Sequence, residues 1–157
     1  MSKEAMVAEG RIHEFVTHSG ADTIDVGRKL VKLLPPPQLL VLRGDLGTGK
    51  TTLVKGIAQA LDAAEPDEVT SPTFTLLHEY DGSRDGRPVK LFHLDVYRLE
   101  GERQLESLGL DDLLTTDALV LVEWGEKFKS IRKKSTGEIA ITSAGGDARR
   151  ITVTLKD

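Results

Sequence analysis

A glycine-rich segment in the first third of the chain carries the clearest chemistry. Residues 44–51 read GDLGTGKT and match the pattern G-x-x-x-x-G-K-[ST] at every fixed position. Glycines let successive backbone N–H groups turn toward a polyphosphate, and a following helix adds the positive end of its dipole. We therefore expect a nucleotide site in which Lys50 reaches the β- and γ-phosphates and the Thr51 hydroxyl binds a bridging Mg²⁺ ion. The residues expected to bind the nucleotide are Gly44, Asp45, Leu46, Gly47, Thr48, Gly49, Lys50, Thr51 and Thr52.

Such a site also needs a carboxylate to hold the metal, directly or through water, and to organise the attacking water. Glu123 follows the apolar run 119–122 (LVLV), and Asp95 follows the less uniform run 91–94 (LFHL). Ligands lie at the carboxyl ends of the strands in doubly wound sheets, so we favour Glu123, at the end of a buried strand, as a Mg²⁺ ligand. Asp95 is expected to orient water or to help the metal from the other side. The predicted catalytic residues are Lys50, Asp95 and Glu123, and the predicted metal ligands are Thr51 and Glu123.

Other residues near these motifs allow two interpretations. The segment 71–75 (SPTFT) lies where P-loop proteins keep a γ-phosphate sensor, but its composition is also that of an ordinary turn. Trp124, the single tryptophan, either covers the site or completes a core. His93, with apolar neighbours, is interpreted as a histidine of the core or of a sheet edge rather than as a ligand. The turn 17–22 and the loop 135–137 are the candidates for the adenine pocket.

The nucleotide is inferred by elimination. The chain contains no asparagine and no D-x-x-G, so both motifs of the common GTPases are missing and ATP is favoured. A small-molecule kinase is the main alternative, because such kinases are also short P-loop proteins. The pairs Arg84/Arg87 and Arg149/Arg150 lie in predicted hairpin turns, which suits an arginine-rich lid poorly. A nucleotide-dependent interaction module is the third class.

The hydrophobic pattern predicts the elements that hold these residues. The fold class is α/β: a single-domain P-loop NTPase fold with a mixed sheet of about seven strands flanked by helices. A turn-rich connector, 81–88, is expected to join two antiparallel strands, and a hairpin near the C-terminus is expected to close one edge of the sheet. The predicted strands are 12–17, 39–43, 74–80, 89–95, 118–122, 138–142 and 151–155, and the predicted helices are 20–34, 51–61 and a pair within 102–114 broken near Gly109.

Length and composition limit the class of protein. The chain has 157 residues, 39% of them hydrophobic and 29% charged, which fits one domain over residues 1–157, with 1–10 expected as a flexible extension. The absence of cysteine excludes disulfides and thiol chemistry. No apolar stretch reaches the length of a signal peptide or a membrane span, so we expect a cytoplasmic protein without membrane contact. The net charge of -4 argues against a DNA-binding surface and leaves only an indirect nucleic-acid role.

Four blocks in this order, residues 44–52, 71–75, 93–98 and 122–124, resemble the TsaE family, the bacterial ATPases of tRNA threonylcarbamoyladenosine synthesis. The resemblance spans about residues 12–155. It implies a Mg²⁺-dependent ATPase of low intrinsic activity that acts on the TsaB–TsaD heterodimer and supports its turnover in modifying adenosine 37 of tRNA. It implies no transfer of the threonylcarbamoyl group by this chain, and contact with tRNA only through the complex.

The resemblance also suggests roles for single residues. It implies Thr51 and Glu123 as Mg²⁺ ligands and Asp95 as an essential acid near the γ-phosphate. Two stretches, 81–88 and the residues before Arg11, look longer than the family usually shows, which leaves the partner contacts open. The residues that it suggests for nucleotide sensing or partner contact are Ser71, Thr73, Thr75, Tyr97, Arg98 and Trp124.

Overall fold

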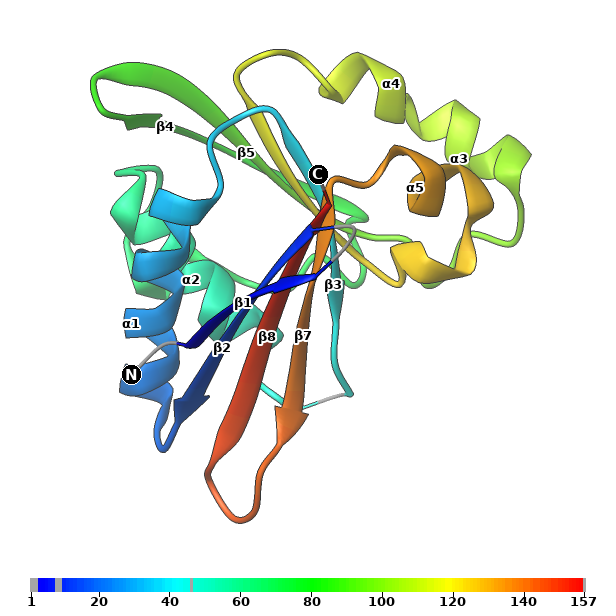
Figure 1. Cartoon of the computed structure of the whole chain (residues 1–157). Helices are drawn as coiled ribbons and strands as arrows, with labels where there is room; N and C mark the ends of the chain where they lie inside the picture. The colour runs from blue at the N-terminus through cyan, green and yellow to red at the C-terminus, as the bar shows by residue number, and fades with distance from the viewer. Residues whose placement is uncertain (1–2, 8–9, 46, 157) are drawn as a thin grey trace.

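One mixed β-sheet forms the centre of the molecule, with helices on its two faces (Figure 1). The computed structural model describes residues 3–7, 10–45 and 47–156. The sheet has the strand order β1-β2-β8-β7-β3-β6-β5-β4. Its strands are β1 (Lys3–Val7), β2 (Gly10–Thr17), β3 (Gln38–Arg43), β4 (Leu77–Arg84), β5 (Arg87–Asp95), β6 (Ala118–Glu123), β7 (Gly137–Ser143) and β8 (Arg149–Lys156). The helices are α1 (Gly20–Leu30), α2 (Lys50–Ala60), α3 (Glu102–Leu108), α4 (Leu110–Leu113) and α5 (Lys129–Lys134), with short 3-10 turns η1 (Val31–Leu33), η2 (Pro66–Glu68) and η3 (Gly125–Lys127).

The middle of the sheet is parallel. Strand β3 pairs in parallel with β6 on one side and with β7 on the other, and β5 pairs in parallel with β6. The pairs β4–β5, β7–β8, β2–β8 and β1–β2 are antiparallel. The carboxyl ends of β3, β6 and β5 therefore lie next to one another, along the edge of the sheet that the strand ends form. This is where an α/β protein binds its ligand.

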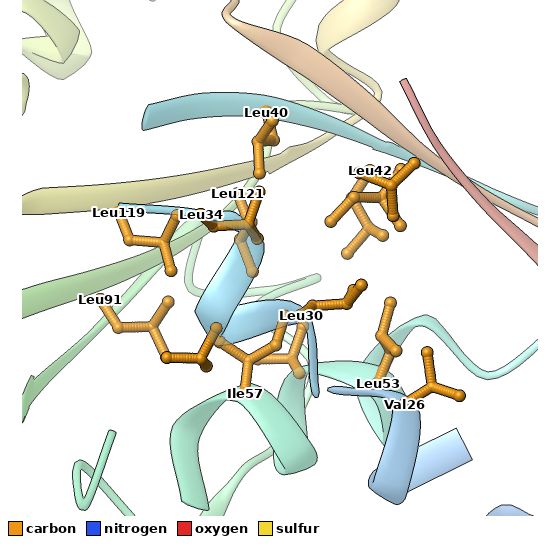
Figure 2. Packing of buried hydrophobic residues seen from close by; sticks show 14 of the residues in the cluster. Val26, Leu30, Leu34, Leu40, Leu42, Leu53, Ile57, Leu91, Leu119 and Leu121 are labelled. Carbon is orange, nitrogen blue, oxygen red and sulfur yellow. The ribbon is translucent and has the colours of Figure 1, made fainter. Parts of the chain in front are cut away.

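Alternating apolar side chains build one core on each face of the sheet. On β6, Leu119 and Leu121 pack toward α1 and α2, whereas Val120 and Val122 pack toward α3, α4 and α5. Figure 2 shows the first core, in which leucines of the strands meet side chains of α1 and α2 such as Leu30 and Ile57. Both faces of the central strands are buried, so the sheet is a rigid support for the residues at its edge.

The α/β class and the mixed sheet are confirmed, and the described residues form eight strands rather than about seven. The additional strand is β1, which pairs with β2 within the segment expected to be a flexible extension. The flexibility of residues 1–10 and the single domain over 1–157 stay predictions. The predicted helices are confirmed, including the break at Gly109, which has a left-handed φ of 80°.

The hairpin of β4 and β5 differs from the prediction. Its first strand begins at Leu77 rather than at residue 74, because Leu76 takes a left-handed φ of 68° that interrupts the extended chain. The connector 81–88 is mostly strand, and the turn is reduced to Asp85 and Gly86. Positive φ values of 53° and 79° at these two residues suit the tight Asp-Gly turn of a twisted hairpin.

The hairpin of β7 and β8 lies inside the sheet, so its predicted place at an edge is wrong. Strand β7 pairs with β3, and the free side of β8 pairs with β2 over its whole length. Strands β1 and β4 are the edges instead. Because β7 runs parallel to β3, the loop between β7 and β8 lies at the same end of the sheet as the phosphate loop, and Arg149 contacts Thr48.

Candidate functional site

The phosphate loop connects the buried strand β3 to the first turn of α2. Gly49 precedes the helix with a left-handed φ of 108°, a conformation that favours glycine. At Gly44 a Cβ atom would lie 2.6 Å from the Thr48 hydroxyl oxygen and 2.9 Å from the carbonyl oxygen of Ile141, so a side chain does not fit there. The N–H and the hydroxyl of Thr48 both donate to the Asp45 carbonyl, at 3.2 and 2.7 Å. Leu46, which was expected to bind the nucleotide, lies outside the described residues.

Lys50 and Glu123 meet at the edge of the sheet. The Lys50 ammonium donates to the Gly44 carbonyl at 2.7 Å, and its Nζ lies 3.2 Å from Oε1 of Glu123. The side chains of Lys50 and Glu123 are only 13% and 5% exposed. A buried charge is stable only with partners, and each of these two groups is one partner of the other.

His93 is the second partner of Glu123. Its Nε2 lies 2.6 Å from Oε2 of Glu123, and the histidine side chain is completely buried. Burial raises the pKa of the Glu123 carboxyl, but the hydrogen bond and charge of His93, followed by those of Lys50, lower it by more, so the pKa lies below its ordinary value. The carboxylate is therefore charged at neutral pH, as a metal ligand must be.

The interpretation of His93 as a core histidine misses this contact. The available signal was a polar residue within an apolar run, two positions before Asp95 and so on the same face of the strand. The pairing with Glu123 depends on the register of β5 against β6, which the sequence does not reveal.

Asp95 lies beside Glu123, in register at the ends of the parallel strands β5 and β6. It is 5% exposed, and its Oδ1 accepts a hydrogen bond from the Tyr97 N–H at 2.9 Å. This bond fixes the carboxylate at the start of the loop that follows β5. The two candidate acids thus lie on neighbouring strands at the same edge as Lys50.

A cleft of about 570 Å³ lies in front of these groups. Two hydroxyl groups of the proposed sensor segment reach it, and Ser71 Oγ and Thr73 Oγ1 lie 2.7 Å apart. Thr75 is instead hydrogen-bonded to Nε2 of His78 at 2.8 Å, and the Arg98 guanidinium lies 4.7 Å from the centre of the Phe74 ring. Neither Thr75 nor Arg98 lines the cleft. The lining residues are Gly47, Gly49, Lys50, Thr51, Thr52, Ser71, Thr73, Asp95, Tyr97, Glu123 and Trp124.

Two aromatic rings border the cleft. Trp124 is 40% exposed and Tyr97 is 57% exposed, and their ring centres lie 4.9 Å apart. The Lys50 ammonium lies 5.9 Å from the Trp124 ring centre. Of the two interpretations of Trp124, its position favours the one in which the ring covers the site.

Another cavity, of about 360 Å³, also borders the phosphate loop. It is lined by His18, Ser19 and Gly20 from the turn before α1, together with Gly47, Gly49 and Thr52, which also line the cleft. Arg149 lines it as well and donates from Nε to the Thr48 carbonyl at 3.2 Å. The other candidate for the adenine pocket, the loop 135–137, borders cavities that contain no residue of the phosphate loop.

The residues at the cleft fit a Mg²⁺ ion bound together with phosphate. Thr51, Asp95 and Glu123 offer only oxygen atoms, the ligands that Mg²⁺ prefers. Within the described part of the chain, no group of three or more His, Cys, Asp or Glu side chains could hold a metal ion. Mg²⁺ is ordinarily held by one or two carboxylates and by phosphate oxygens, so the residues at hand suffice.

Comparisons with known proteins agree with this arrangement. The family described as threonylcarbamoyl adenosine biosynthesis protein TsaE matches residues 17–151. The TsaE protein of Bacillus subtilis is 39% identical over 133 residues, covering 85% of this chain and 79% of that protein. The TsaE protein of Streptomyces coelicolor is 38% identical over 135 residues, covering 83% and 88%. The crystal structure of Bacillus subtilis YdiB superposes with a TM-score of 0.65 at 30% identity, covering 100% of this chain and 88% of that one.

Proposed function

The chain belongs to the TsaE family of threonylcarbamoyladenosine biosynthesis, and from this premise we propose that it is a Mg²⁺-dependent ATPase of that tRNA modification. The observation that carries the proposal is the Lys50–Glu123 pair, with Nζ and Oε1 3.2 Å apart, at the mouth of the phosphate loop. A cation for phosphate and a charged carboxylate for metal are thus held together in one cleft with the Thr51 hydroxyl and Asp95.

The residues of the cleft divide the work of hydrolysis. Lys50 neutralises charge on the β- and γ-phosphates, and the amides of the phosphate loop hold the phosphates in line. Thr51 and Glu123 would hold Mg²⁺, directly or through water, and the bound ion would supply positive charge to the phosphate oxygens. Asp95, fixed by the Tyr97 amide, orients the attacking water.

The second cavity is the proposed site of the adenosine. It shares Gly47, Gly49 and Thr52 with the cleft, so a nucleotide whose phosphates follow the loop can extend into it. The turn before α1 lines this cavity, which supports residues 17–22 over the loop 135–137 as the adenine pocket.

The partner in this proposal is the TsaB–TsaD heterodimer. The isolated chain is expected to hydrolyse ATP slowly, because within the described part of the chain no arginine lines the cleft that Lys50 shares with Asp95 and Glu123. Binding to the pair completes the site and supports turnover of the complex, and tRNA is contacted only through it.

Since its proposed partners act on tRNA, we place the protein in the cytoplasm. No helix among residues 3–7, 10–45 and 47–156 is long and apolar enough to cross a membrane.

The test measures ATP hydrolysis by the purified chain, alone and with the TsaB–TsaD pair of its own organism. Lys50→Ala serves as the blank. Stimulation by the pair, dependent on Mg²⁺ and absent in Lys50→Ala, is the expected result. Equal rates with and without the pair would overturn the partner role, and fast phosphate transfer to a metabolite would replace the proposal with a small-molecule kinase.

A further inference from the structure

We propose that His93 is a positioning residue that holds the Glu123 carboxylate in its metal-binding orientation, an inference that rests on the proposed ATPase function. The histidine side chain is completely buried, and its Nε2 lies 2.6 Å from Oε2 of Glu123. A charged carboxylate only accepts hydrogen bonds, so the Nε2–H of His93 is the donor. Oε2 is thereby engaged, and Oε1 faces Lys50.

The register of the strands explains why this contact forms. His93 pairs with Leu121, so Glu123 lies two residues farther along β6 and on the same face of the sheet. His93 thus lies between the leucine core beneath α1 and α2 and the acidic edge of the sheet. It contacts Glu123 from the side of the core and does not line the cleft.

The surroundings of His93 do not otherwise require a polar residue. On its own face of the sheet, the neighbouring Leu91 and Leu121 are buried and apolar, and its Nδ1 has no hydrogen-bond partner among the described residues. A buried polar atom without a partner is unfavourable. The unpartnered Nδ1 therefore lowers the stability of the fold, whereas Nε2 supplies one hydrogen bond to the Glu123 carboxylate.

Lys50 alone cannot hold Glu123 during the reaction. In the structure the Lys50 ammonium contacts both the Gly44 carbonyl and Oε1 of Glu123. The proposed function requires this ammonium to turn to the β- and γ-phosphates, which releases Oε1 for the metal. The bond from His93 then remains to fix the carboxylate. Hydrogen-bonded partners of metal ligands have this effect generally, and their loss weakens metal affinity or activity by about 10- to 100-fold.

The chain offers variants that separate positioning from general stability. His93→Leu removes the donor, whereas His93→Gln retains an N–H that can reach a carboxylate. His13→Leu is the matched control, because His13 is also a buried histidine with an unpartnered ring nitrogen, but it lies on β2 and does not line the cleft. Trp124, the single tryptophan, borders the cleft and supplies a fluorescence signal for nucleotide binding.

The first experiment titrates Mg²⁺ against each variant with ATP present and records both Trp124 fluorescence and hydrolysis. We expect His93→Leu to need about 10- to 100-fold more Mg²⁺ for half the maximal response, with ATP binding in EDTA unchanged. His93→Gln should recover part of the loss, and His13→Leu should need no more Mg²⁺ than the unmodified chain. Equal Mg²⁺ requirements for His93→Leu and His13→Leu would overturn the role of His93. Failure of the unmodified chain to bind Mg²⁺ and ATP would instead overturn the proposed function.

A second experiment is independent of activity and of the folding of His93→Leu. Long-range ¹H–¹⁵N spectra of the imidazole rings should show His93 protonated at Nε2. In Glu123→Gln the His93 ring signals should shift, whereas those of His13 should not. Unchanged His93 signals in Glu123→Gln would show that the hydrogen bond is absent and would overturn the inference.

Discussion

At the scale of single residues, Glu123 has both a structural role and a proposed chemical role in the cleft. It is 5% exposed, and each of its oxygen atoms has one partner, Lys50 at 3.2 Å and His93 at 2.6 Å. In the proposed mechanism, the carboxylate that pairs with Lys50 becomes available to a metal ion once the lysine turns to phosphate. The burial that would disfavour its charge is thus offset by groups that belong to the site.

Replacing the proposed metal ligands should abolish hydrolysis without unfolding the protein. We expect Thr51→Ala and Glu123→Ala to lower kcat by about 10²- to 10³-fold, because each removes a group that stabilises charge in the transition state. Circular dichroism should show the native fold, since the β6 core lies on the residues before Glu123. Thr152→Ala on β8, outside the residues that line the cleft, is the control. Near-normal turnover of Glu123→Ala with Mg²⁺ would mean that the roles given to the two acids are wrong.

At the scale of elements, the packing of α1 on α2 fixes where the phosphate loop ends. The two helices approach so closely that a Cβ atom on Gly56 would lie 2.0 Å from the Ile24 carbonyl oxygen. We therefore expect Gly56→Ala to lower the free energy of unfolding by about 1–3 kcal/mol, because the clash is with backbone that cannot rotate away. Chemical denaturation measures the change. Gly20→Ala, whose added methyl group meets nothing within 4 Å, should leave stability nearly unchanged. Equal stabilities of the two variants would show that α1 can shift freely.

A hydrogen-bonded carboxylate links α3 to α5 on the opposite face. The Ser130 hydroxyl donates to Oε2 of Glu102 at 2.6 Å, and the Ser130 hydroxyl and amide lower the pKa of this carboxyl. A depressed pKa means that the contact stabilises the fold above the unfolded pKa of Glu102 and that this stabilisation is lost as the pH falls through the folded pKa. Ser130→Ala should raise the Glu102 pKa toward its ordinary value, as carboxyl ¹³C titration can measure. An unmoved Glu102 titration in Ser130→Ala would contradict the contact.

A feature can be predicted from the sequence when the residues that determine it lie close together along the chain. The phosphate loop, α1, α2 and the apolar strands β3 and β6 follow from local patterns, and the structure contains them. The internal place of the β7–β8 hairpin depends on pairing with β2, more than a hundred residues earlier, so the local alternation could not reveal it. The His93–Glu123 contact depends in the same way on the register of β5 and β6.

At the scale of the whole molecule, exposed apolar side chains gather near the cleft. Among the described residues, the large hydrophobic side chains that are exposed are Val16, Phe74, Tyr97 and Trp124. Tyr97 and Trp124 line the cleft, and Phe74 follows Thr73, which lines it too. Aromatic rings exposed to water beside a site are typical of protein contacts. This arrangement favours a partner that covers the cleft while nucleotide is bound.

Phe74 provides the sharpest test of such a contact, because it is 81% exposed and its ring meets the Arg98 guanidinium rather than the cleft. We expect Phe74→Ala to weaken binding to the TsaB–TsaD pair by about 5- to 30-fold, corresponding to about 1–2 kcal/mol, because a large ring buried on binding is lost. Calorimetry with the pair measures this change, and ATP affinity of the free chain should change far less. Val16→Ala, which truncates an apolar residue 45% exposed on β2, should bind the pair normally. If Val16→Ala weakens binding and Phe74→Ala does not, the partner docks on the β2 side of the sheet. The proposal that the partner completes the cleft by direct contact would then be wrong.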